Sequence, residues 1–307
     1  MDTAQRLDGR ALGYIGIALL TWSSAYAAIA YALTSFTPGE VALARLAIGS
    51  LCFAALMVVK RIPLPARRDW PQLALLGVTG LTVYHLCLNY AETRIASGTA
   101  SILISLIPAA TAAVSAVWVG ERLSPRMLAG LGVALVGVIL VVLASGKQVR
   151  FEPMAGLVLI SVLVSAFYWV GQKPLFERNS MLGVTAFTFF AGTLGALPFG
   201  LHLPQALEAA PRAHIAALFW LGIAPTFIGY LAWNAALRQA SASQVSSFIY
   251  FSPPIAVLIG WLWLGEQPGA LTLVGGAITV GGVVLANARR RPAPAPVAEV
   301  DTACERC

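Results

Sequence analysis

The chain contains one stretch twice, and this duplication limits its folds to those with two related halves. The segment that begins at Asn89 is repeated from Asn234 onward, 145 residues later and without a gap. Apolar runs match by chance, but a proline in mid-run and a Trp-x-Gly-Glu sequence at the same spacing rarely do. We interpret the match as a gene duplication. The matched pairs are Asn89/Asn234, Ser101/Ser246, Pro108/Pro253, Trp118/Trp263, Gly120/Gly265, Glu121/Glu266 and Gly130/Gly275.

The composition indicates a membrane protein. Of 307 residues, 58% are hydrophobic and 11% are charged, whereas a soluble domain has about 25% charged residues. Apolar runs of at least about 18 residues recur along the chain, which is the pattern of transmembrane helices. We therefore expect an all-α integral membrane protein.

Ten apolar runs predict ten transmembrane helices. The second run begins at Pro38-Gly39-Glu40, a proline followed by an acidic residue, which is typical of a helix start. The expected helices occupy 11–33, 38–59, 70–91, 98–119, 126–145, 154–174, 181–201, 214–237, 244–264 and 270–288.

An odd number of helices in each half has a geometric consequence. Because each half crosses the membrane five times, the second must be inverted relative to the first. Two inverted-topology five-helix repeats are typical of transporters, with a binding site at the repeat interface near the midplane. The expected segments are a cytoplasmic lead at 1–10, a first repeat at 11–145, a connecting loop at 146–153, a second repeat at 154–288 and a disordered cytoplasmic tail at 289–307.

Lysine and arginine are unevenly distributed between the predicted loops. With the N-terminus in the cytoplasm, inner segments hold fifteen of the 20 basic residues, outer loops hold four, and Arg45 lies within the second helix. Both termini are therefore predicted to be cytoplasmic. This placement accounts for the net charge of +7, so no nucleic acid partner is expected. The expected partners are the lipid bilayer and a small-molecule substrate, and the oligomeric state is left open, a monomer included.

Polar and aromatic side chains at membrane depth are expected to face the bundle interior, because lipid tolerates few of them. Thr82, His85 and Asn89 share one face of the third helix, and Tyr230 and Asn234 are the matching positions of the last two. The candidate substrate-binding residues are Trp22, Tyr26, Tyr84, His85, Asn89, Trp169, Tyr230 and Asn234.

These residues also have simpler interpretations. Tryptophans near helix ends are usually interface anchors, and Trp70, Trp118 and Trp263 are assigned that role. The asparagines can serve only to hydrogen-bond neighbouring helices. His85 is either a proton carrier or a neutral hydrogen-bonding partner in a cavity wall, which we prefer. With no carboxylate expected near the midplane, transport should not require proton coupling.

Prolines interrupt the fourth and ninth predicted helices at matching places. A proline removes one intrahelical hydrogen bond and kinks the helix, so Pro108, Pro253 and Pro254 are candidate helix kinks or gates. The fifth and tenth helices are rich in glycine, which indicates close helix packing.

These motifs resemble a known transporter family. The Pro-Gly-Glu…Ala-Arg-Leu sequence from Pro38 to Leu46, the Pro…Gly-Glu ends of the fourth and ninth helices, and the inverted repeats are similar to the drug/metabolite transporter superfamily, EamA type, over 11–288. The resemblance implies a multi-pass protein of the bacterial inner (plasma) membrane. Arg45 has an apolar counterpart in the second repeat, and whether it binds substrate or pairs with helix-end carbonyls stays open.

A few residues carry a resemblance to a subgroup. Trp22, the pair Tyr84-His85 and Trp169 resemble the YddG-type exporters of aromatic amino acids. The resemblance implies that Trp22, His85 and Trp169 line the substrate cavity. An aromatic, sparsely charged cavity suits zwitterions with large side chains, since ring stacking supplies affinity.

The expected function is export of amino acids, aromatic ones in particular, or of similar small metabolites by alternating access. One alternative is export of other small amphiphilic metabolites or drugs. Another is a membrane-embedded enzyme, but the aspartates and glutamates lie at helix ends or in loops. No cofactor and no metal is expected. Cys304 and Cys307 form a C-x-x-C in the tail without partner ligands.

Overall fold

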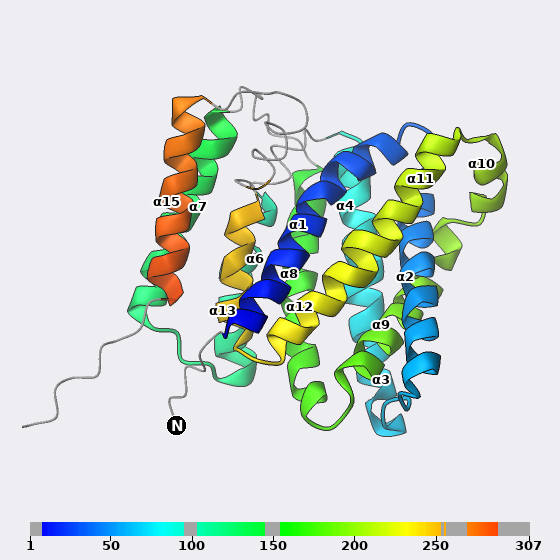
Figure 1. Ribbon diagram of the computed structural model, residues 1–307, viewed down its shortest axis with the longest axis horizontal. Helices are drawn as coiled ribbons and strands as arrows, with labels where there is room; N and C mark the ends of the chain where they lie inside the picture. The colour runs from blue at the N-terminus through cyan, green and yellow to red at the C-terminus, as the bar shows by residue number, and fades with distance from the viewer. Residues whose placement is uncertain (1–7, 95–102, 145–153, 253–254, 256–268, 288–307) are drawn as a thin grey trace, which may run out of the picture.

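The computed structural model describes residues 8–94, 103–144, 154–252, 255 and 269–287. Within these ranges every regular element is helical (Figure 1). Six segments are long and apolar enough to cross a membrane: Gly9–Ala32, Pro38–Lys60, Arg67–Glu92, Gly156–Glu177, Met181–Phe199 and Arg212–Leu237. Shorter apolar helices span Ile107–Val119, Pro125–Leu140 and Leu273–Ala286. The chain is therefore a multi-pass membrane protein.

Several of these segments consist of two or more consecutive elements. The α-helices are α1 (Gly9–Ala32), α2 (Pro38–Lys60), α3 (Trp70–Gly77), α4 (Tyr84–Glu92), α6 (Ile107–Val114), α7 (Pro125–Ala144), α8 (Ala155–Gln172), α9 (Met181–Ala196), α10 (Leu203–Ala209), α11 (Arg212–Leu221), α12 (Tyr230–Leu237), α13 (Ala242–Ser246) and α15 (Ala270–Asn287). Short 3-10 turns are η1 (Arg67–Asp69), η4 (Lys173–Glu177), η5 (Leu197–Phe199) and η7 (Ser247–Phe251). The π-helical segments are η2 (Val78–Val83), η3 (Ser115–Val119) and η6 (Gly222–Gly229).

The start of α2 confirms the helix start predicted at Pro38. The Thr37 hydroxyl accepts a hydrogen bond from the backbone N–H of Glu40, and the Glu40 carboxylate accepts one from the N–H of Thr37. This reciprocal capping box satisfies two backbone donors that a helix end otherwise leaves unpaired. The capping box thus fixes the first turn of α2. Arg45 lies two turns further along this helix, and its side chain extends into the bundle.

The segment between the seventh and eighth predicted helices was expected to be a loop, and this expectation is wrong. Residues Leu203–Ala209 form the short helix α10, which lies at the outer edge of the bundle beside α11 (Figure 1). The segment is too short to give a clear helical period.

Two π-helical segments lie in the middle of long spans, and the sequence did not predict them. η2 joins α3 to α4, and η6 joins α11 to α12. They occupy matching positions of the duplicated sequence, since adding the 145-residue offset to 78–83 gives 223–228. Pro225 lies inside η6 and cannot donate a backbone hydrogen bond. Such π-bulges occur frequently at functional sites.

The repeated Trp-x-Gly-Glu sequence has a structural explanation in its first copy. Gly120 adopts a left-handed backbone conformation with φ 69° at the end of η3, and the N–H of Glu121 bonds to the carbonyl of Ser115 at 3.1 Å. Glycine is the residue that adopts this conformation at least cost, so Gly120 ends the helix. The matching Gly265 lies outside the described residues.

Pro108 lies at the predicted interruption of the fourth helix. The helix is broken by a turn at Ser105 and Leu106, and Pro108 occupies the first turn of α6, where a missing N–H is tolerated. The helix is thus interrupted just before Pro108, and the kink and gating roles of Pro108 stay predictions. The matching Pro253 and Pro254 lie outside the described residues.

Helix packing follows a pattern that relates the two halves. α1 packs against α11, η6 and α12, whereas α8 packs against α3, η2 and α4. α2 packs against η6, and α9 packs against η2. Each contact becomes the other when every element is replaced by its counterpart in the other half. The counterparts are α1 and α8, α2 and α9, α3 and α11, η2 and η6, and α4 and α12. Close approaches between glycines follow the same pattern: Gly192 lies against Gly77, and Gly49 lies against Gly222.

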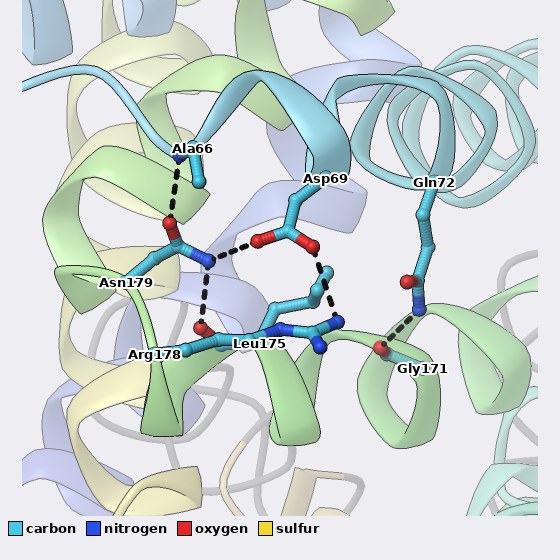
Figure 2. Close-up of polar contacts among 7 residues, drawn as sticks. All are labelled: Ala66, Asp69, Gln72, Gly171, Leu175, Arg178 and Asn179. Atoms are coloured by element: carbon cyan, nitrogen blue, oxygen red, sulfur yellow. Dashed lines mark hydrogen bonds and ion pairs between the residues drawn. The ribbon is translucent and has the colours of Figure 1, made fainter.

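Polar links connect the two halves at opposite ends of the bundle. At one end, Asp69 forms an ion pair with Arg178 at 3.1 Å and accepts a hydrogen bond from Asn179 at 2.7 Å (Figure 2). The Asn179 amide oxygen also accepts from the N–H of Ala66 at 2.9 Å. At the other end, where α1 turns into α2, the hydroxyl of Ser35 bonds to Nδ1 of His214.

α7 and α15 form a closely packed pair at one edge of the bundle (Figure 1). A Cβ atom at Gly130 would fall within 2.7 Å of the Cβ of Ala286, and one at Gly282 within 2.8 Å of the Cβ of Ala134. Not every glycine here has this role, because a Cβ at Gly132 would meet nothing within 4 Å. The close packing predicted for these helices is therefore confirmed at Gly130, Gly137 and Gly282 and wrong at Gly132, Gly276 and Gly281.

This difference allows a matched test of the α7–α15 contact. Gly130→Leu should destabilise the purified protein by about 1–3 kcal/mol, since overpacking a helix contact forces backbone shifts. Gly132→Leu, on the exposed face of the same helix, should leave stability close to that of the wild type. Thermal unfolding in detergent measures both variants, and equal loss in the two would contradict the packing described here.

Candidate functional site

A buried cavity of about 50 Å³ lies among α1, α4, α8 and α12. Six of the eight candidate substrate-binding residues line it: Trp22, Tyr26, Tyr84, His85, Trp169 and Tyr230. Arg45 and Ser165 add polar atoms, and Ile29, Leu88 and Ile107 are among the aliphatic residues that complete the wall. Elements from both halves of the chain therefore contribute to one site.

Two tryptophans, Trp22 and Trp169, line the cavity, and a third, Trp233, packs against both. The rings of Trp22 and Trp169 are parallel to within 1°, with centroids 6.1 Å apart. Trp233 lies beside both, at 4.8 Å from Trp22 and 5.0 Å from Trp169. Aromatic pairs at these separations attract one another beyond the burial of their area. Trp233 was not a candidate from the sequence, and its position next to Asn234 was its only signal.

The π-helical segment η6 holds Trp22 in this wall. The indole Nε1 of Trp22 donates a hydrogen bond to the carbonyl of Pro225 at 2.9 Å. Gly229 makes room for the ring, because a Cβ there would lie 2.7 Å from Nε1 of Trp22. A buried indole N–H needs a partner, and an irregular helix leaves a carbonyl able to accept.

His85 lines the cavity from α4. Its ring is 1% exposed and contacts Tyr84 at 4.9 Å and Tyr230 at 6.5 Å between centroids. Neither ring nitrogen has a hydrogen-bond partner in the described part of the protein. A buried imidazole without a partner is unfavourable, so His85 offers the cavity one donor and one acceptor.

Arg45 is a buried cation in the same cavity. Its side chain is 3% exposed, and Nε donates to the hydroxyl of Thr226 in η6 at 3.1 Å. It interacts electrostatically with Glu92 and with the tyrosines of the wall. Of the two roles left open by the sequence, pairing with helix-end carbonyls is not observed among the described residues.

Glu92 was overlooked in the sequence because it lies at the end of α4. Both carboxylate oxygens are buried without a hydrogen-bond partner among the described residues. The sequence did contain a signal that Glu92 faces inward, since His85, Asn89 and Glu92 share one helical face at i, i+4 and i+7. Glu92 does not line the cavity itself.

The two candidate asparagines do not line the cavity. Asn89 donates its amide to the carbonyl of Pro38 at the start of α2, at 3.0 Å. Asn234 accepts from Gln172 and donates to Thr185, both at 2.9 Å. Each asparagine thus ties α4 or α12 to neighbouring helices, which is the simpler interpretation given above.

Comparisons with known proteins give the class. The model of the EamA-like transporter family matches residues 10–143 and again residues 153–288. The chain belongs to this family, and it is therefore a transporter by family.

Several relatives match over most of their length. A probable terminal-alkyne amino-acid exporter of Streptantibioticus cattleyicolor is 34% identical over 94% of this chain and 98% of its own length. A pseudopaline exporter of Pseudomonas aeruginosa is 27% identical over 86% of this chain and 91% of its own. A probable amino-acid metabolite efflux pump of Salmonella typhimurium is 25% identical over 88% and 92%. One crystal structure, 22% identical, has the same fold with a TM-score of 0.71 over 90% of this chain and 96% of its own.

The Asn234 network provides a test of its structural role. Asn234→Leu should lower the free energy of unfolding by about 1–3 kcal/mol, because Gln172 and Thr185 lose a buried partner. Gln239→Leu is the matched control, since the Gln239 side chain, in the turn after α12, bonds only to the carbonyl of Ala235. Thermal unfolding compares the two variants, and a wild-type melting temperature for Asn234→Leu would show that the network adds no stability.

Proposed function

We propose that this protein exports amino acids, aromatic ones in particular, from the cytoplasm by alternating access. The observation that carries this proposal is the cavity walled by Trp22, Trp169 and Tyr230. Flat rings favour a substrate with an aromatic or large apolar side chain. The cavity also presents His85 and Arg45 to the polar end of such a substrate.

The relatives support an exporter of small metabolites. Two of them carry names of amino-acid or amino-acid metabolite exporters, and one exports pseudopaline. Export of other small amphiphilic metabolites or drugs is the alternative, and the pseudopaline exporter is the observation that favours it. A flux panel that includes amino acids and apolar amines separates the two.

The inverted-repeat architecture is part of the proposal. We place the first five-helix repeat at 11–145 and the second at 154–288, which gives ten transmembrane helices. The exchange of equivalent contacts between the halves supports it. So does helix direction: α1 ends beside the first turn of α2, whereas α8 leads to Arg178, which pairs with Asp69 beyond the last turn of α2. The first helices of the two repeats thus run in opposite directions.

The size of the cavity supports alternating access. A volume of about 50 Å³ holds a few waters, since one water needs about 10–15 Å³ by this measure. An amino acid with a large side chain needs more, so loading requires the helices around Trp22 and Trp169 to separate. Movement about the interface of two repeats is the usual way in which such transporters open.

Transport measurements test the role of the aromatic wall. In proteoliposomes supplied with a panel of amino acids, Trp22→Ala, His85→Ala and Trp169→Ala should each lower the rate at equal protein level. Loss of one stacked ring should cost about 0.5–1.5 kcal/mol of binding beyond the buried area. The control is Trp220→Ala. Trp220 bonds to Ser24 and so links the same two spans as the bond from Trp22 to Pro225, but its side chain is 51% exposed. Wild-type rates in all three cavity variants would contradict the assignment.

The membrane orientation is tested by labelling. We propose that both termini face the cytoplasm of a bacterial inner membrane, on the basis of the basic loops. In a variant without native cysteines, a single cysteine replacing Gly146 or Ala209 should react with an impermeant maleimide in intact cells. One replacing Arg67 should react only after the membrane is opened. Labelling at position 67 from outside would overturn this orientation.

A further inference from the structure

We propose that Arg45 binds the carboxylate group of the substrate, so that this transporter selects molecules with a free carboxylate. This inference rests on the proposed function, because it concerns the polar end of the same cavity. It goes beyond that function by naming the chemical group that the substrate must carry and the residue that binds this group.

The first argument is the uncompensated charge of Arg45. The side chain is almost fully buried, and in the described part of the protein no carboxylate lies within ion-pair distance of it, since the ion pair observed there joins Arg178 and Asp69. A buried cation is unfavourable unless it is paired and hydrogen-bonded. Arginine stays charged under all ordinary conditions. An anionic ligand is therefore the partner that would make its burial favourable.

The second argument is the geometry of the guanidinium group. Its Nε is held by Thr226 at 3.1 Å, which fixes the plane of the group. The two terminal nitrogens make no hydrogen bond in the described residues and belong to a cavity-lining side chain. A guanidinium held in this way offers two parallel N–H donors, which match the two oxygens of a carboxylate.

The third argument is the charge pattern around the site. Glu92 interacts electrostatically with Arg45 but forms no ion pair with it, and both of its oxygens lack partners among the described residues. Glu92 is therefore not the ion-pair partner that compensates the charge of Arg45. The cavity itself presents the aromatic wall and Arg45, which suit the side chain and the carboxylate of an amino acid.

The experiment compares three probes that differ at one end: L-phenylalanine, L-phenylalaninamide and phenylacetate. Calorimetry measures their binding to the purified protein, and proteoliposomes measure flux of the first two. We expect the wild type to prefer L-phenylalanine over its amide by about 10- to 100-fold, since one charge-assisted pair is lost. In Arg45→Gln the ratio should fall toward one, and phenylacetate binding should fall by a similar factor.

Arg61→Gln is the matched control, because Arg61 follows the other end of the same helix and does not line the cavity. It should keep the wild-type ratio. If Arg45→Gln does not fold, Arg45→Lys carries the test: it keeps the charge but loses the planar pair of donors, so L-phenylalanine should weaken while the amide does not.

The outcomes separate this inference from the proposed function. Flux of L-phenylalanine with no preference over the amide, or an unchanged ratio in folded Arg45 variants, would overturn the role of Arg45 and leave amino-acid export standing. Absent flux of every amino acid, together with phenylacetate binding that depends on Arg45, would support the carboxylate site and reject amino-acid export. A wild type that binds neither carboxylate probe would overturn the inference as well.

Discussion

The candidate site depends on the irregular backbone of η6. In a regular helix each carbonyl is used within the helix, and lipid offers no alternative partner. The π-helical segment around Pro225 instead offers acceptors on two consecutive residues to side chains that line the cavity. The carbonyl of Pro225 accepts from Trp22, and the hydroxyl of Thr226 accepts from Arg45. One local departure from helix geometry thus positions both the aromatic wall and the cation, which come from two different helices.

The sequence predicted the parts of this structure that follow from long-range pattern. Apolar runs located the long helices, because the bilayer requires about 20 apolar residues for each span, and Pro38 marked the start of α2. The duplication identified Tyr230 as the counterpart of His85, and both line the cavity. The π segments and α10 were missed because they are short and their residues have no distinctive period. The signal for η6 was a proline between Gly222 and Gly229, which by itself only suggests a kink.

Side-chain roles were predicted less well than helices, for a physical reason. The pattern of one helix tells which residues face inward, but not whether they face a cavity or a neighbouring helix. Asn89 and Asn234 face inward like His85, yet the amide nitrogen of Asn89 is bonded to Pro38, and both amide atoms of Asn234 are bonded to neighbouring helices. Glu92 appeared to be a residue at a helix end, and only the packing of the bundle places its oxygens away from solvent. Partners across helices therefore decide the role, and these are not visible in one sequence.

The two polar links at the ends of the bundle bear on how the cavity opens. Asp69, Arg178 and Asn179 join the two halves at one end (Figure 2), and Ser35 with His214 joins them at the other. The cavity between them is too small for a large substrate. In the proposed alternating access, opening toward one side strains or breaks the link on that side, while the link on the other side stays closed. Because the link at Asp69 contains an ion pair and several hydrogen bonds, and the link at Ser35 is a hydroxyl–imidazole contact beside Tyr31, the two sides should differ in the free energy needed to open them.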